Sequence, residues 1–154
     1  MKSDFFVRDT INNLLFKFAN SFDLKDWDGM ESCLAPQVDC DYSGLRGKKE
    51  TLTVKEYVAL RRSALEPLQT QHLFSNLEID ISDDAHQTRC RCSALILRRR
   101  GEQFFNTHAI YEFVCVQKNK RWLLSKIKQT VLWNEGDSTI HSGAATAQTT
   151  SSRE

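Results

Sequence analysis

The sequence predicts an α+β fold in which N-terminal helices pack on the concave face of a curved antiparallel sheet. Helical periodicity and capping signals are confined to about the first 65 residues, and long alternating segments separated by short turns follow. Helices followed by a meander of strands are typical of domains whose helices cover one face of the sheet. The length of 154 residues suits one hydrophobic core.

Three helices are expected in the first half of the chain. The first carries an apolar stripe with the i, i+3, i+4, i+7 spacing of a half-buried helix and ends near Asp23. The second begins at a cap on Asp26 and ends before Pro36. The third opens with a capping box formed by Thr53 and Glu56. The stripe of the first helix consists of Ile11, Leu14, Leu15, Phe18, Ala19 and Phe22.

Alternating apolar and polar residues predict the strands. Residues 38–43 alternate with Tyr42 in the buried set, and the turn-rich segment 44–50 follows. The run from Arg98 to Arg100 falls at a predicted hairpin turn and is interpreted as a solvated charge run. Four longer strands are expected at residues 73–82, 88–99, 104–117 and 121–133.

Composition divides the chain into two parts. Residues 1–135 contain all the predicted helices and strands, and they form the expected domain. Residues 136–154 are almost wholly small and polar, so they cannot bury enough apolar area to offset the entropy lost on ordering. We expect residues 136–154 to form a disordered tail.

Charge and hydropathy exclude several classes of protein. Lys and Arg total 21 against 20 Asp and Glu, so the chain lacks the basic excess that favours nucleic acid. No apolar run approaches the roughly 20 residues of a membrane span, and the N-terminus resembles no signal peptide, so a cytoplasmic location is expected. The odd set of five cysteines has no zinc-site spacing, which indicates reduced core residues.

Three residues are candidates for acid-base chemistry. Asp23 follows the core-facing Phe22, so its carboxylate can point inward, although aspartate is also common in turns at helix ends. His72 leads into a strand, and His108 lies on a mostly apolar strand face where it needs a partner or a cavity. A lone histidine there is often a satisfied core residue, but two histidines with a carboxylate suit proton transfer near neutral pH.

Other residues are expected to bind a ligand or to pack beside it. Gln129 occupies a strand position where the alternation calls for an apolar residue, so its amide either orients a ligand or bonds to a neighbour. Phe22 and Trp27 face inward from the helices, and Tyr42 is either an amphipathic core residue or a hydroxyl donor. The chain has no nucleotide-binding or zinc-protease motif, so no cofactor and no metal are expected.

Several segments resemble scytalone dehydratase and its SnoaL-like relatives. They are SFDLKDWDGMESCLAPQVDCDYS, the TQH of QTQHLF, NTHAIYEF and RWLLSKIKQTVLWNEG, which occur in the same order from about Phe18 to Gly136. These relatives belong to the nuclear transport factor 2-like (cystatin-like) superfamily, a cone of curved sheet closed by helices with the ligand inside. The resemblance implies the same cone for this chain and oligomerisation, as a dimer or trimer, through the outer sheet face.

The resemblance also implies roles for individual residues. Asp23, His72 and His108 match the acid-base set of the dehydratase. Our own expectation for the mechanism is that His108, oriented by Asp23, acts as the base and His72 as the acid. Tyr42 matches one of two tyrosines that hold a water against the substrate carbonyl, while Phe22 stands in place of the other, so scytalone is not the expected substrate. The polar tail replaces an apolar closing segment, which implies a more open pocket.

We therefore expect a cofactor-independent lyase (dehydratase) or isomerase acting on a small cyclic or polyketide-like carbonyl compound. Two other classes stay open. The fold is reused for non-catalytic ligand binding or assembly, which predicts affinity without turnover. A small subunit of a ring-hydroxylating oxygenase is also compatible and requires a large partner chain. A metal held by Asp23, His72 and His108 requires that the three converge on one side of the metal.

Overall fold

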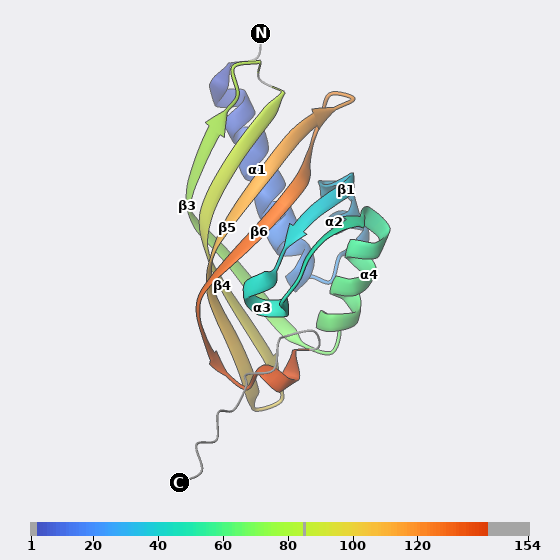
Figure 1. The fold of residues 1–154 in the computed structure, drawn as a ribbon, viewed down its shortest axis with the longest axis vertical. Helices are drawn as coiled ribbons and strands as arrows, with labels where there is room; N and C mark the ends of the chain where they lie inside the picture. Colours follow the sequence, from blue (N-terminus) through green and yellow to red (C-terminus); the bar gives the residue numbers. More distant parts are fainter. Residues whose placement is uncertain (1–2, 85, 142–154) are drawn as a thin grey trace.

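The computed structural model describes residues 3–84 and 86–141, which form four α-helices, six strands and one short 3-10 helix (Figure 1). The strands form one sheet in the order β2-β1-β6-β5-β4-β3. The helices are α1 (Asp4–Asp23), α2 (Trp27–Cys33), α3 (Ser43–Arg46), α4 (Val54–Leu65) and η1 (Ser138–Ile140). The strands are β1 (Leu34–Asp41), β2 (Lys49–Thr53), β3 (Gln69–Ile81), β4 (Gln87–Arg100), β5 (Gln103–Lys118) and β6 (Arg121–Gly136).

The α+β class and the three main helices are confirmed. The side chain of Ser3 caps α1 by accepting a hydrogen bond from Phe6 N, and Asp26 caps α2 by accepting one from Gly29 N. The capping box at α4 is present: Glu56 N donates to Thr53 Oγ1 at 3.2 Å, and Thr53 N donates to Glu56 Oε2 at 2.9 Å. Local sequence therefore specifies where these helices begin.

Two details of the predicted sheet are wrong. The sheet is mixed and not wholly antiparallel, because β1 pairs with β6 in the parallel sense. The segment expected to be a turn contains the single-turn helix α3 and the strand β2, which pairs with β1 as a hairpin. The parallel pairing of β1 with β6 is long-range, and alternation within one strand does not specify it.

The helix α1 lies along one face of the strongly curved sheet, and α2 and α4 lie beside it near β1 (Figure 1). We call this covered face the inner face and the opposite one the outer face. Phe18 of α1 is 1% exposed, and its ring lies edge-on to Phe113 of β5 at 6.2 Å. Each fully buried side chain of this size contributes on the order of 2 kcal/mol, so the packing of α1 on the inner face holds the fold together.

Residues one apart in each strand point to opposite faces of the sheet. The buried inner set includes Cys90, Cys92, Ala94, Ile96, Arg98, Phe105, Thr107, Ala109, Tyr111, Phe113 and Cys115. The outer set is charged at one end and apolar at the other, where Leu73, Phe104, Leu132 and Trp133 are exposed. All five cysteines are free and buried, as expected for reduced core residues.

The C-terminal segment begins with ordered structure. Gly136 ends β6, and Asp137 N donates to Phe104 O at 2.7 Å, which directs η1 back over the end of the sheet. The prediction of disorder from residue 136 is thus wrong for residues 136–141, and its remainder lies outside the described residues. Within residues 3–84 and 86–141, no helix is both long enough and apolar enough to cross a membrane.

Candidate active site

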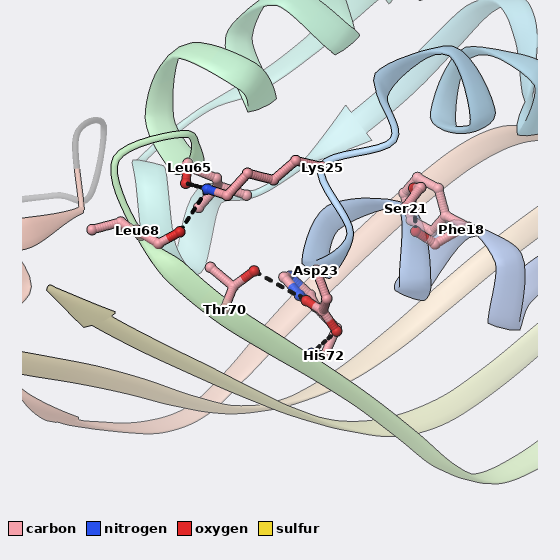
Figure 2. A network of polar contacts seen from close by, with 8 residues as sticks. All are labelled: Phe18, Ser21, Asp23, Lys25, Leu65, Leu68, Thr70 and His72. Atoms are coloured by element: carbon pink, nitrogen blue, oxygen red, sulfur yellow. Dashed lines mark hydrogen bonds and ion pairs between the residues drawn. The ribbon is translucent and has the colours of Figure 1, made fainter.

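The turn after α1 places Asp23 against the start of β3. Lys25 has a positive φ of 53°, which turns the chain sharply. Its Nζ donates to the carbonyl oxygens of Leu65 and Leu68 at 2.9 and 2.6 Å (Figure 2). It also donates to the carbonyl oxygen of Glu66 at 2.6 Å. Charge-assisted bonds of this kind are among the stronger hydrogen bonds in proteins. Lys25 thus ties the α1–α2 turn to the connection between α4 and β3.

Asp23 accepts three hydrogen bonds from β3. Its Oδ1 accepts from Thr70 Oγ1 at 3.0 Å and contacts His72 Nδ1 at 2.7 Å, and its Oδ2 accepts from His72 N at 2.8 Å (Figure 2). A carboxylate only accepts hydrogen bonds, so Nδ1 of His72 carries a hydrogen and Nε2 of the neutral ring carries the free electron pair. Asp23 therefore sets both the orientation and the tautomer of His72.

His72 lies in an apolar environment. Its imidazole stacks on the ring of Phe22 at 4.4 Å between centroids, with 21° between the planes, and the residue is 7% exposed. Burial lowers the pKa of His72, because a charged imidazolium loses its hydration, and the positive charge of Arg98 lowers it too. The hydrogen bond to Asp23 raises the pKa but does not cancel the effect of burial. The ring is therefore neutral at pH 7 and can accept a proton.

His72 lines a small, partly enclosed cavity of ≈ 20 Å³ between the inner face, α3 and α4. This volume holds about one water molecule. Other lining groups come from α1, α3, α4, the sheet and the C-terminal segment. The lining residues are Phe22, Tyr42, Leu45, Arg46, Arg61, Leu65, His72, Ile96, Arg98, Tyr111, Gln129 and His141.

Three tyrosines supply hydroxyl groups at or near the cavity. The hydroxyls of Tyr42 and Tyr57 are 2.7 Å apart, and Gln129 Nε2 donates to the hydroxyl of Tyr111 at 2.9 Å. One hydrogen between the Tyr42 and Tyr57 oxygens forms their mutual bond, which leaves the other free for a ligand. Burial raises the pKa of Tyr42, Tyr57 and Tyr111, so all three hydroxyls stay protonated and can act as donors.

His108 does not reach this cavity, so its predicted place beside Asp23 and His72 is wrong. In the sheet, His72 lies opposite Ile96 and then Thr107, all on the inner face, whereas His108 lies opposite Leu95 on the outer face. His108 stacks on Trp133 at 4.0 Å, and its Nε2 contacts Glu135 Oε1 at 3.0 Å.

A metal held by Asp23, His72 and His108 is excluded as well, because the three do not share a face of the sheet. The described residues also contain no other group of three or more histidine, cysteine, aspartate or glutamate side chains arranged to hold a metal ion.

A model of the SnoaL-like domain matches residues 7–128, which is most of the chain. The chain belongs to the SnoaL-like family. Scytalone dehydratase of Colletotrichum orbiculare is 30% identical over 139 residues, which cover 82% of this chain and 74% of that enzyme. The suspected relationship to scytalone dehydratase and its SnoaL-like relatives is thereby confirmed.

Solved structures confirm the nuclear transport factor 2-like fold of this SnoaL-like domain. The Kfla4162 protein from Kribbella flavida superimposes with a TM-score of 0.83 at 18% identity, over 90% of this chain and 98% of its own. The hexachlorocyclohexane dehydrochlorinase LinA-type3 from Novosphingobium barchaimii gives a TM-score of 0.72 at 17% identity, over 87% and 92% of the two chains. At these identities the likeness concerns the fold alone.

Three arginines that line the cavity of the SnoaL-like domain were not among the sequence candidates. Arg61 lies on α4, and Arg46 lies in the segment expected to be a turn. Arg98 was interpreted as part of a solvated run, yet it is 3% exposed. The burial of Arg98 could have been predicted from its spacing. Ala94, Ile96 and Arg98 are two residues apart in β4, so their side chains point to the same inner face.

The structure also places Trp27 and the start of the C-terminal segment. Trp27 packs partly buried against the core from α2 and does not line the cavity, contrary to the expectation. Ile140 and His141 are 8% and 6% exposed, and His141 lines the cavity. Residues 137–141 of the SnoaL-like domain thus cover part of the cavity, which the composition of the tail did not indicate.

Proposed function

We propose that this SnoaL-like protein is a cofactor-independent lyase or isomerase acting on a small cyclic or polyketide-like carbonyl compound. The observation that carries the proposal is the contact of 2.7 Å between Asp23 Oδ1 and His72 Nδ1, with His72 at the wall of a buried cavity. A carboxylate-oriented imidazole with its second nitrogen free is a general base.

His72 performs the proton transfer in this mechanism. Its Nε2 removes a hydrogen from the carbon next to the substrate carbonyl, and the electron pair of the broken C–H bond forms an enolate. Asp23 stabilises the imidazolium that results. In a dehydration, the enolate then expels the hydroxyl on the next carbon, and His72 returns its proton to that oxygen as water leaves. In an isomerisation, His72 returns the proton to another carbon.

Hydroxyl groups near the cavity stabilise the enolate oxygen. Tyr42 and Tyr57 together have one hydrogen left to donate, and Tyr111 has one because its oxygen accepts from Gln129. Phe22 contributes a stacked ring that holds the plane of His72 in place of a hydroxyl. Donors already oriented in a water-excluded site stabilise developing charge strongly.

Two relatives support the reaction class. The relative from Colletotrichum orbiculare is named a dehydratase, and the structural neighbour from Novosphingobium barchaimii is named a dehydrochlorinase. Both names describe eliminations, which begin or end with the transfer of a proton. The substrate of this chain is part of the proposal.

The test uses a panel of cyclic β-hydroxy ketones. It measures the exchange of hydrogen for deuterium next to the carbonyl and the elimination of water. Wild-type protein is incubated with each ketone in D2O, and NMR records deuterium uptake next to the carbonyl while absorbance records enone formation. We expect one or both reactions with wild type and their loss in His72→Gln. Full activity of a folded His72→Gln variant would contradict the mechanism, and ligand binding without exchange would favour the non-catalytic class.

A further inference from the structure

Three arginines meet at the cavity without an acidic partner. Arg46, Arg61 and Arg98 come from α3, α4 and β4, and all three line the cavity. Within the part of the chain that the structure describes, none of them forms an ion pair, and no aspartate or glutamate lines the cavity. Arg61 is 5% exposed and Arg98 is 3% exposed. Buried charges in proteins are normally paired, so this arrangement is unusual.

The guanidinium groups have buried nitrogen atoms without hydrogen-bond partners. These are Nη1 of Arg46, Nε and Nη2 of Arg61, and Nε of Arg98. Among the described residues, seven buried polar side-chain atoms lack a partner, and six of them belong to cavity-lining residues. An unsatisfied donor on a charged group is destabilising, so a ligand that accepts these bonds would stabilise the protein.

Neighbouring residues hold the arginines with donor edges free. The Arg61 guanidinium lies 4.5 Å from the ring centre of Tyr42 and 4.7 Å from that of Tyr57. Stacking on the flat faces leaves the edge of a guanidinium free to donate. Arg98 Nη1 donates to Thr107 Oγ1 at 2.8 Å, which fixes the side chain while its Nε stays free.

The electrostatics of the cavity agree with this geometry. Burial and the charges of Arg98, Arg61 and Arg46 lower the pKa of His141 to about 3. Burial lowers the pKa of Arg98 to about 10. Burial lowers the pKa of Arg46 and the charge of Glu50 acts to raise it, but Glu50 does not line the cavity. The excess of positive charge at the cavity attracts an anion.

The walls of the cavity select among anions. Phe22, Leu45, Leu65 and Ile96 give it apolar sides, and the donors gather on Arg46, Arg61 and Arg98. An inorganic oxyanion satisfies the donors and leaves the apolar walls without a partner, whereas an organic acid satisfies both. The planar carboxylate also matches the paired donors on the edge of a guanidinium.

We propose that the cavity binds an organic carboxylate, with Arg61 and Arg98 holding its oxygens and Arg46 adding a third cation at the rim. The anion site is inferred from the arginines alone. The further statement that the bound carboxylate is the substrate rests on the proposed function. Held in this way, the carboxylate anchors one end of the molecule while its carbon skeleton extends toward Nε2 of His72. Because ≈ 20 Å³ does not hold such a molecule, His141 and η1 move outward on binding.

The test compares acids with their uncharged amides. Binding to wild-type protein is measured by calorimetry and thermal shift for benzoate and benzamide, cyclohexanecarboxylate and its carboxamide, and nicotinate and nicotinamide. We expect at least one acid to bind about 10-fold or more tightly than its amide, because charge-assisted hydrogen bonds are about twice as strong as neutral ones. Equal affinity, or no affinity, across all three pairs overturns the proposal.

Variants identify the residues that bind the acid. Arg98→Gln should weaken binding of the acid about 10-fold and leave the amide unchanged, whereas Arg99→Gln should change neither, since Arg99 is exposed and donates to Gly101 O. If Arg98→Gln does not fold, the same binding measurement is made on Arg46→Gln, whose side chain lies at the half-buried rim of the cavity. Wild-type affinity for the acid in either arginine variant contradicts the assignment.

Two further measurements separate this inference from its alternatives. Inorganic phosphate that binds as tightly as the acids indicates a simple oxyanion site and overturns the carboxylate assignment. His108→Gln should bind the acid as wild type does, because His108 lies on the outer face of the sheet. Acid binding without any catalysis thus contradicts the proposed function alone, and catalysis without acid binding contradicts this inference alone.

Discussion

His72 and His108 lie on opposite faces of the same sheet, and their surroundings differ accordingly. His72 on the inner face is 7% exposed, hydrogen-bonded to Asp23 and stacked on Phe22. The side chain of His108 on the outer face is 25% exposed and lies between Trp133 and Glu135, whose side chain is half exposed. Each histidine has an aromatic ring and a carboxylate beside it. Burial alone makes one of them a candidate catalytic base.

An aromatic ring and a carboxylate beside a histidine therefore do not by themselves make a catalytic site. The carboxylate of Glu135 is in solvent, where charges are screened and a hydrogen bond contributes little. The Asp23–His72 pair is largely buried beside a partly enclosed cavity, where the same interaction is stronger than in solvent.

The largest expected effect distinguishes the two histidines directly. His72→Gln should lower turnover of an identified substrate about 100- to 10,000-fold, because the general base is lost. His108→Gln, the matched control, should stay within about 2-fold of wild type. Steady-state kinetics on both purified variants, with circular dichroism to confirm folding, make the measurement. Equal losses in the two variants would show that the outer face takes part in catalysis.

A smaller effect is expected where the chain passes from the sheet to η1 over the cavity. Gly136 has a φ of 95°, and an added Cβ would lie 2.2 Å from Phe104 O. Gly136→Ala should therefore destabilise the protein by about 2 kcal/mol or displace η1 and open the cavity. Urea unfolding measures the loss of stability, and quenching of fluorescence by iodide measures the opening of the cavity. Gly101→Ala is the control for the clash, since Gly101 also has a positive φ of 61° but its Cβ would meet nothing within 4 Å. It should show only the smaller loss of stability that comes from the backbone conformation.

The pH dependence of stability provides a third comparison. The pKa values of His72 and His141 are lower in the folded protein than the ordinary value near 6.5, and that of His141 is about 3. The unfolded chain therefore binds more protons below pH 6.5, so stability falls as the pH falls. Between pH 7 and pH 5 the loss should reach up to about 2 kcal/mol for His141.

Urea unfolding at several pH values tests this dependence. His72→Gln and His141→Gln should each lose less stability on acidification than wild type does. His108→Gln should follow the wild-type profile. An unchanged pH slope in both inner-face variants would show that neither histidine is buried in its neutral form.

The smallest effect on folding is expected on the outer face, where we predict that copies of the chain associate as a dimer or trimer. Leu132 is 55% exposed and Trp133 is 54% exposed. Leu132→Glu should change the free energy of unfolding of one subunit by no more than about 0.5 kcal/mol and weaken association. Light scattering after size exclusion at micromolar concentration measures the mass. A wild-type monomer under these conditions contradicts the prediction.

Much of the inner face could be predicted from local pattern. The helix ending at Asp23, the capping box of Thr53 and Glu56, and the strands around His72 and Gln129 follow from periodicity and capping, which depend on neighbouring residues. His108 could not be placed in the same way. The alternation groups it correctly with Ile110 on one face of β5, but apolar residues occur on both faces of that strand. Only the pairing with β4 shows that this face is the outer one.

The sequence by itself determined the α+β class, where the helices begin, and Asp23 and His72 as separate candidates, because capping and alternation act over a few residues. The contact between Asp23 and His72 came from the structure. The tertiary structure alone decided the burial of Arg98, the position of His141 at the cavity and the exclusion of His108 from the cavity. These three results depend on which strands pair and where the C-terminal segment packs. Both are long-range consequences of core packing, and no local pattern of residues records them.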